Sequence, residues 1–328
     1  MHIRRRSRRI ILIVLIILIL IALVLVGIGI RNTSQVQQRG TMSEGFGQRE
    51  TIEIDGQLYG KKWDVETFLL MGIDKQNNRL KGFRDGGQAD SLLVVVLDHD
   101  AKKVNILQLD RNTMAMITVL GIVGDNVGLR EWQICLAHAY GATQEENNRY
   151  AVEAVQRLLN NITIDGYATM NLVDIAKLNH ALGGVTVTLE DDFTDYDPLM
   201  YVGATLKLTD DQAAEYLHER MNVADGTNTN RMRRHRAYLS SAIQTVRERT
   251  SKEKEFINSF VDDLREITFT DLAYGRIINE LNRAYKYTIE PIETLDGYSD
   301  MSPGGYARFY ADQKSIDEWV TSHYYEPI

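Results

Sequence analysis

The chain has almost no cysteine. Cys135 is the only one in 328 residues, which excludes an internal disulfide. The seven histidines form no cluster with it, so a structural zinc site of the Cys/His type is also excluded. Cys135 lies in the apolar-leaning run ICLAHAYG, and we expect it to be a small buried side chain.

Basic residues are also in deficit, with 37 Lys and Arg against 45 Asp and Glu. Residues 1–31 hold six of the arginines and no acids, which leaves 31 basic and 45 acidic residues, a formal charge of -14, for the rest of the chain. An acidic domain repels nucleic acid on average. A basic site in such a domain is therefore local, and it suits a compact anion better than a long polyanion.

One long apolar run stands near the start of the chain. Residues 10–30 are 21 residues without a charge, and five arginines precede them. This length spans a bilayer, whereas a cleaved signal peptide has an apolar region of about 7 to 15 residues and a small-x-small cleavage site. The arginines favour a cytoplasmic N-terminus. We therefore expect a single-pass membrane protein with a cytoplasmic segment 1–9 and a transmembrane helix 10–30.

The chain after the apolar run divides into a stalk and a domain. Residues 31–50 are polar and rich in Gly, Ser and Gln, which is typical of a flexible stalk. Residues 51–328 are long enough to form a sizeable core, and 44% of the whole chain is hydrophobic. We expect this part to be one extracytoplasmic domain.

The patterns in residues 65–109 predict strands. The run VETFLLMGID indicates a strand followed by a turn, and residues 92–97 and 104–109 indicate two strands joined by a polar turn. Residues 92–97 are apolar without alternation, which predicts a strand covered on both faces. The expected fold class is α/β, with a central β-sheet flanked by helices, and mixed α+β is the alternative.

Helical patterns follow these strands. Residues 145–160 and 171–184 carry apolar residues at helical spacing, the strand-like run VTVTLEDD comes next, and residues 230–248 form another amphipathic pattern. Thr209 and Gln212 have the spacing of a capping box at the start of a helix. Residues 251–328 indicate further helix and a polar, aromatic tail.

Residues 217–236, LHERMNVADGTNTNRMRRHR, concentrate five arginines and two histidines. At 100° per residue, Arg231 and Arg234 lie within about 60° of Tyr238, beside the apolar side of their helix. Arg231 lies near the helix N-terminus, where free N–H groups favour an anion, and Arg220 ends the preceding helix. The segment is therefore a candidate anion site. The alternative is a solvated basic helix paired with carboxylates.

Charged residues also stand at the ends of the predicted strands. Asp74 follows the first strand, Asp90 precedes the second, and Arg111 follows the third. Ligands of α/β folds bind at the ends of strands, and carboxylates beside arginines can hold Mg²⁺ together with a phosphate. The alternative is a set of strand-end salt bridges, each worth about 0 to 1 kcal/mol.

Taken together, these motifs resemble the LytR-CpsA-Psr family of membrane-anchored ligases. The resemblance covers residues 68–246 and rests on an ordered set of segments: LLMGID, ADSLLVVVLD, LQLDRNTM, AHAYG, HALGGVTVTLEDDF, LTDDQAAEYLHERM and NRMRRHRAYL. The transmembrane-then-stalk layout agrees with it. Asp74 and Asp90 match the family's acidic pair. The positions that match the arginines of its motifs are Arg111, Arg220, Arg231 and Arg234.

The resemblance implies a Mg²⁺-dependent phosphotransferase of the bacterial cell membrane. Its donor is a polyprenyl pyrophosphate carrying a glycopolymer such as teichoic acid or capsular polysaccharide, and its acceptor is peptidoglycan. It implies that Asp74, Asp90 and Arg111 are catalytic, and that Asp90 and Asp74 hold the metal. It further implies that the arginines at 111, 220, 231 and 234 bind the pyrophosphate.

Several positions of the candidate site differ from the family pattern. The family has arginine at the positions of Gln88 and His218, and glutamine at the position of His235; Asp110 and Asn112 replace its proline and aspartate. Arg84 is a candidate to supply the charge missing at Gln88, and we include Gln88, His218 and His235 among the candidate pyrophosphate-binding residues. These differences support an alternative, a non-catalytic or regulatory protein that binds polyprenyl phosphate or the cell wall.

Overall fold

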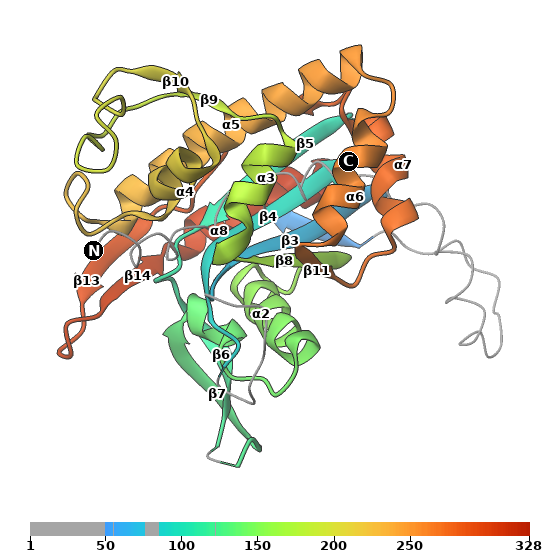
Figure 1. The fold of residues 1–328 in the computed structure, drawn as a ribbon. Helices are drawn as coiled ribbons and strands as arrows, with labels where there is room; N and C mark the ends of the chain where they lie inside the picture. The colour runs from blue at the N-terminus through green and yellow to red at the C-terminus, as the bar shows by residue number, and fades with distance from the viewer. Residues whose placement is uncertain (1–49, 55, 76–84, 122) are drawn as a thin grey trace.

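A computed structural model describes residues 50–54, 56–75, 85–121 and 123–328 (Figure 1). The expected transmembrane helix 10–30, the stalk up to residue 49 and Arg84 lie outside the described residues. Within the described ranges, no helix combines the length and the apolar character that crossing a membrane requires.

The core of the fold is a mixed six-stranded sheet. Its strands are β3 (Val65–Asp74), β4 (Gln88–Asp98), β5 (Lys103–Leu109), β8 (Gly166–Asn171), β11 (Thr268–Thr270) and β12 (Thr288–Ile289). They lie in the order β11-β8-β3-β4-β5-β12. The neighbours β3 and β4, β4 and β5, and β8 and β11 are antiparallel, while β3 with β8 and β5 with β12 are parallel. The prediction of a central β-sheet flanked by helices is confirmed, and this sheet contains both parallel and antiparallel strand pairs.

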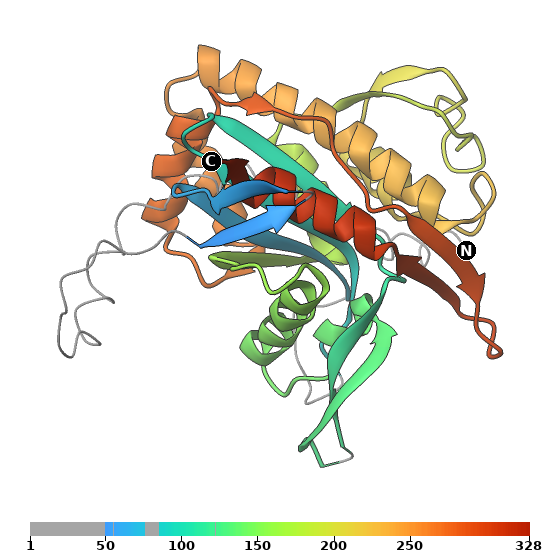
Figure 2. The ribbon, with the colours of Figure 1, turned by 180° about the vertical axis from the view of Figure 1, so that it is seen from behind.

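The sheet is covered on both faces. Helix α3 (Ile175–Ala181) lies over one face, and α8 (Gln313–Tyr324) lies over the other (Figures 1 and 2). The side chains of residues 92–97 are therefore at most 2% exposed. The apolar run without alternation follows from this burial, because both faces of β4 must pack against apolar neighbours.

The remaining helices are η1 (Ile134–His138), α2 (Gln144–Leu158), η2 (Leu172–Asp174), α4 (Asp210–His218), α5 (Asn228–Lys252), α6 (Phe256–Arg265) and α7 (Tyr274–Ala284). The predicted capping box opens α4: the Thr209 hydroxyl accepts from the Gln212 N–H at 3.2 Å, and the Gln212 side chain accepts from the Thr209 N–H at 3.0 Å. At the start of α5, the Thr227 hydroxyl alone provides the cap, accepting from the Asn230 N–H at 3.3 Å.

Smaller strand pairs surround this core. They are β6 (Met114–Leu120) with β7 (Asn126–Gln133), β9 (Thr186–Thr188) with β10 (Thr205–Lys207), β13 (Gly297–Met301) with β14 (Ala307–Ala311), and β1 (Thr51–Ile54) with β2 (Gln57–Lys61) and β15 (Tyr325–Pro327). The strand expected in VTVTLEDD is only three residues long. The aromatic tail folds into the β13-β14 hairpin, which extends away from the central sheet (Figure 2).

Candidate functional site

The antiparallel order of β3, β4 and β5 brings three candidate residues to one edge of the sheet. Asp74 ends β3 opposite Gln88, the first residue of β4. Arg111 follows β5, whose last residue Leu109 pairs with Leu92 of β4. The end of β3, the start of β4 and the end of β5 therefore meet at one place, as the strand-end charges predict.

Asp90 lies between two arginines at this edge. Its Oδ1 forms an ion pair with Nη1 of Arg111, and its Oδ2 accepts from Nη1 of Arg231 at 3.0 Å. Asp90 and Arg231 are buried. The structure thus brings Arg231, from the basic segment 217–236, to the strand ends 141 residues away.

A chain of amide and carboxylate groups fixes Arg231 from its other side. Nη2 of Arg231 donates to the Asn228 side-chain oxygen at 2.8 Å, and the Asn228 amide donates to Asp110 at 2.9 Å. The same Asp110 oxygen accepts from the Asn112 N–H at 2.8 Å. Burial raises the pKa of Asp110 above its ordinary value. The role of Asn228 was not predicted, although its place one residue after the helix cap Thr227 puts it at the anion-binding end of α5.

Cys135 also belongs to this site, a role that its sequence context did not indicate. The prediction that it is buried is confirmed, but its Sγ accepts from Nη2 of Arg111 at 3.4 Å. The same guanidinium nitrogen donates to the side-chain oxygen of Gln88. Burial raises the pKa of Cys135 to about 11, so the group is a neutral thiol at physiological pH. Gln88 and Cys135 together orient Arg111.

Arg220 differs from Arg111 and Arg231 because it forms no ion pair with a carboxylate of the described residues. Among the interactions of the described residues, its hydrogen bond goes to the sulfur of Met221 at 3.4 Å. Desolvation lowers the pKa of Arg220, and the positive charges of Arg231 and Arg111 lower it further. A half-buried cation beside two others is a favourable place for an anion.

Asp74 and His218 complete the predicted set at this edge. Asp74 remains accessible to solvent, while partial loss of hydration and the nearby charge of Asp90 raise its pKa. Nδ1 of His218 is 3.6 Å from a carboxylate oxygen of Glu219. Burial lowers the pKa of His218, against the influence of Glu219 and Asp74. His218 therefore contributes little positive charge at neutral pH in the protein without a ligand.

The structure places Arg234 and His235 away from this group. Nη1 of Arg234 pairs with Asp191 at 3.0 Å, and its Nε donates to the Tyr216 carbonyl at 2.9 Å. His235 contacts the Leu217 carbonyl at 3.0 Å through Nε2. Both side chains are almost fully buried. These contacts join α5 to the C-terminal end of α4, so they hold the segment that carries His218 and Arg220.

A cleft of about 1360 Å³ opens beside the arginines. Its lining includes Gln88, Arg111 and Arg220, together with residues of β7 and of the β13-β14 hairpin. Arg111 and Arg220 therefore face a volume large enough for a ligand much bigger than a single phosphate.

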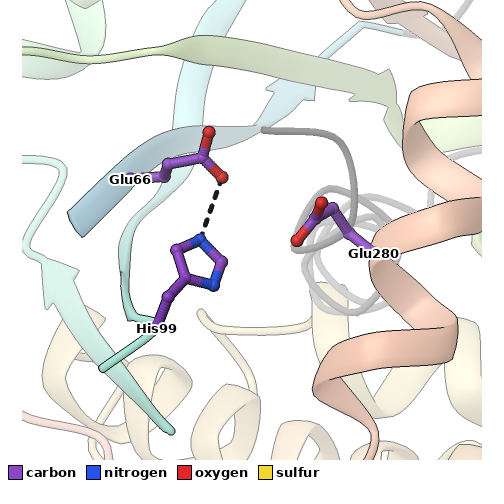
Figure 3. Close-up of side chains that lie close together, drawn as sticks. All are labelled: Glu66, His99 and Glu280. Atoms are coloured by element: carbon purple, nitrogen blue, oxygen red, sulfur yellow. Dashed lines mark hydrogen bonds and ion pairs between the residues drawn. The ribbon is translucent and has the colours of Figure 1, made fainter. Parts of the chain in front are cut away.

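A second group of ionisable side chains lies near the opposite end of β3 (Figure 3). One ligand atom from each of Glu66, His99 and Glu280 lies within 4.8 Å of the others, and this buried group could hold a metal ion. His99 Nε2 is 3.1 Å from Glu66, and its Nδ1 is 3.2 Å from the Tyr287 hydroxyl. Arg276 also donates to Glu66 at 3.2 Å, and this positive charge offsets part of the attraction for a cation.

Several known proteins are similar to this chain in sequence. The LytR_cpsA_psr family model matches residues 30–323. Biofilm regulatory protein A of Streptococcus mutans is 25% identical over 245 residues, covering 71% of this chain and 53% of that protein. The polyisoprenyl-teichoic acid–peptidoglycan teichoic acid transferase TagU of Halalkalibacterium halodurans is 24% identical over 233 residues, covering 71% of this chain and 69% of that protein. The matched region is thus about half of the first relative.

Solved structures with the same fold include those of TagV and TagT. The crystal structure of Bacillus subtilis TagV aligns with a TM-score of 0.62 and 22% identity over 80% of this chain and 97% of that one. The structure of TagT bound to LI-WTA aligns with a TM-score of 0.60 and 20% identity over 79% and 89%. These similarities establish the common fold. Because the family model spans nearly all of the described residues, the chain belongs to the LytR-CpsA-Psr family.

Proposed function

We propose that this protein transfers a glycopolymer from a polyprenyl pyrophosphate carrier to peptidoglycan and releases polyprenyl phosphate. One observation carries the proposal: Arg111 and Arg220 line a large cleft, Arg231 shares Asp90 with Arg111, and Arg220 has no carboxylate partner among the described residues. The relative TagU, whose name gives a polyisoprenyl-linked donor and a peptidoglycan acceptor, supports the same substrate classes.

The arginines would bind the pyrophosphate. Arginine donates in a planar fork that suits phosphate oxygens, and a hydrogen bond to a charged group contributes about 1.5 to 3 kcal/mol. Arg220 and Arg111 line the cleft and would contact the ligand directly. Arg231, which is paired with Asp90, would add positive charge near the ligand without lining the cleft. Gln88 and His218 would contribute polar groups near the pyrophosphate. Arg234 and His235 would position the end of α4, since their donors are already bonded there.

Asp74 and Asp90 fit a divalent cation by their chemistry. They supply hard carboxylate oxygens, which Mg²⁺ prefers, and desolvation together with the charge of Asp90 raises the pKa of Asp74, an effect that a cation would oppose. Asp90 would therefore hold Mg²⁺, and Asp74 would either share the ion or act as the base. When bound, Mg²⁺ would supply positive charge to the pyrophosphate oxygens.

The proposed reaction exchanges one phosphorus–oxygen bond for another. The oxygen of an acceptor hydroxyl bonds to the phosphorus on the glycan side, and the bond from that phosphorus to the bridging oxygen breaks. Polyprenyl phosphate leaves with the electron pair, and the hydroxyl proton passes to Asp74. When Asp74 does not bind the metal, its raised pKa makes its carboxylate a stronger base than an ordinary aspartate. Arg111, beside the cleft, would stabilise charge on the phosphoryl oxygens.

We further propose that residues 10–30 anchor the protein in the cell membrane, with the N-terminus in the cytoplasm and the domain outside. The long uncharged run and the arginines before it support this orientation. The donor lipid would then lie in the same membrane as the anchor, and the stalk would set the distance between the membrane and the cleft.

A non-catalytic polyprenyl-phosphate-binding or wall-binding protein is the second candidate. The observation that favours it is the pairing of both Asp90 oxygens with arginines, because this leaves fewer lone pairs for a metal. The replacements at Gln88 and His218 point in the same direction. Such a protein would keep the anion site and lack turnover.

The test separates binding from turnover. The purified full-length chain would be incubated with a lipid-linked glycopolymer, peptidoglycan fragments and Mg²⁺, and released polyprenyl phosphate would be measured beside lipid binding. Asp74→Asn and Asp90→Asn should each abolish release while binding remains measurable. Asp192→Asn, in an exposed loop, should behave as wild type. If the wild type binds several lipid-linked glycopolymers but releases no polyprenyl phosphate from any of them, the transferase proposal is wrong and the non-catalytic binding protein is favoured.

A further inference from the structure

The lining of the cleft includes an aromatic wall, which we define as Trp132, Tyr140, Tyr306 and Tyr310, and an arginine end, which we define as Arg111 and Arg220. Trp132 and Tyr306 are 41% and 69% exposed. Large aromatic side chains are costly to expose in such a group unless they serve a binding surface. The aromatic wall lines the same cleft as Arg111 and Arg220, so a molecule lying on it would reach the arginines.

The hairpin presents aromatic and polar pairs side by side. Tyr298 stacks on Tyr310 with ring centres 5.0 Å apart and planes at 15°, and Asp300 accepts from two nitrogens of Arg308 at 2.7 and 2.6 Å. Tyr298 faces Tyr310 and Asp300 faces Arg308 in the strand register. Because alternate residues of a strand share a face, both pairs lie on one surface. Flat apolar rings beside bidentate polar groups are complementary to a sugar ring, which has apolar C–H faces and a rim of hydroxyls.

The hairpin is bonded to the loop that carries Arg111. The Phe309 N–H donates to the Asn112 carbonyl at 3.0 Å. The Gln133 amide donates to the Ala307 carbonyl at 2.6 Å and to the Asn112 side chain at 3.3 Å. The aromatic wall therefore has a fixed position relative to the arginine end of the cleft.

The arginine end and the aromatic wall have different charged neighbours in the lining of the cleft. The arginine end carries two positive charges, whereas the β7 and hairpin residues of the lining include Glu131 and the mutually neutralised pair of Asp300 and Arg308. The arginine end suits an anion, and the surface around the aromatic wall suits an uncharged chain. From this difference we infer that the aromatic wall binds the glycan strand of the acceptor and directs one of its hydroxyls toward the arginine end. This inference rests on the proposed transferase function.

Other occupants fit the aromatic wall less well. A polyprenyl chain would desolvate Asp300, Arg308 and Gln133 without offering hydrogen bonds in return. An anionic donor polymer would meet the carboxylate of Glu131. A neutral polysaccharide avoids both costs, because its hydroxyls can bond to the polar groups while its ring faces lie on the tyrosines and the tryptophan.

The experiment uses the full-length chain in detergent and two separate probes. Chitotetraose, a neutral oligosaccharide of N-acetylglucosamine, tests the aromatic wall by isothermal titration, and farnesyl pyrophosphate tests the arginine end. Tyr306→Ala and Trp132→Ala should each raise the Kd for chitotetraose by about fivefold or more, because each removes one stacking surface. Tyr306→Phe keeps the ring and should retain most of the binding. None of these variants should change the Kd for farnesyl pyrophosphate by more than about twofold.

The controls are exposed rings outside this cleft. Trp63 and Tyr201 are 64% and 56% exposed, and Trp63→Ala and Tyr201→Ala should bind chitotetraose as wild type does. Thermal melting confirms that each variant is folded. No chitotetraose binding by the wild type, or equal binding by wild type and both wall variants, overturns the inference. If neither the wild type nor any variant binds farnesyl pyrophosphate while the wild type still binds chitotetraose, the proposed transferase function is contradicted. The assignment of the aromatic wall as a glycan-binding surface would then still hold.

Discussion

Arg231 of α5 and Asp90 of β4 form a buried ion pair at 3.0 Å. The pair connects the helix to the strand edge, and Asp90 also pairs with Arg111. Removing one partner of a buried ion pair leaves an uncompensated charge and is strongly destabilising. Variants at Asp90, Arg111 or Arg231 will therefore change stability as well as ligand binding, and each needs a melting curve beside its activity.

Arg220→Ala is the cleaner test of anion binding. Arg220 is partly exposed and bonds to Met221 rather than to a carboxylate, so its loss should weaken farnesyl pyrophosphate binding by about tenfold or more, corresponding to about 1.4 kcal/mol. The melting temperature should stay within about 2 °C of wild type. Arg265→Ala, at a surface ion pair on α6, is the matched control. If wild type and Arg220→Ala bind farnesyl pyrophosphate with equal affinity, Arg220 does not contribute to anion binding.

Arg234→Ala should act on stability. Its side chain is 1% exposed, pairs with Asp191 and donates to the Tyr216 carbonyl. Its loss should lower the free energy of unfolding by about 3 kcal/mol in urea denaturation. Arg233→Ala also breaks a pair with Asp191, but from a more exposed position, and should cost less than about 1 kcal/mol. Similar losses in both variants would contradict the structural role of Arg234.

Glu215 gives a pH-dependent prediction. Burial, and then the charges of Glu219 and Asp211, raise its pKa from 4.5 to about 7. The folded protein therefore keeps this proton to a higher pH than the unfolded chain does, and stability falls as the pH rises from about 4.5 through about 7. Glu215→Gln has no charge to bury. Its melting temperature should exceed that of wild type by more at pH 8 than at pH 5.

The control for this comparison is Glu318→Gln, at an exposed position of α8. Its difference from wild type should be the same at both pH values. A difference for Glu215→Gln that is equally independent of pH would show that the Glu215 carboxylate does not carry an unfavourable charge in the folded protein.

The proposed membrane orientation predicts the result of protease treatment. In intact, wall-stripped cells, an added protease should degrade the domain, because residues after 30 would lie outside. Full protection would contradict the orientation. N-terminal sequencing of the membrane-bound protein should begin before residue 20, and a start beyond it would exclude the anchor.

Local patterns in the sequence were enough to predict several elements. The capping box of Thr209 and Gln212 depends on residues three positions apart, and the burial of residues 92–97 follows from their apolar character. Both signals are contained within one element, so no tertiary information is needed to read them.

The partners of the arginines could not be predicted in this way. A helical projection gives the direction of Arg231 and Arg234 but not the carboxylate that each meets; the first reaches Asp90 and the second Asp191. The contact between Cys135 and Arg111 also depends on how η1 packs against β4. Such contacts follow from the tertiary fold, in which residues distant in sequence come together.

The β2-β15 pairing has a consequence for the order of assembly. Tyr59 lies opposite Pro327, and Lys61 lies opposite Tyr325, so β2 acquires its second neighbour only after residues 325–327 have been synthesised. Contacts over such sequence separations close large loops and slow folding. During synthesis, β2 must keep one edge open for nearly the whole length of the domain, and that unpaired edge is a site where a partly made chain can aggregate.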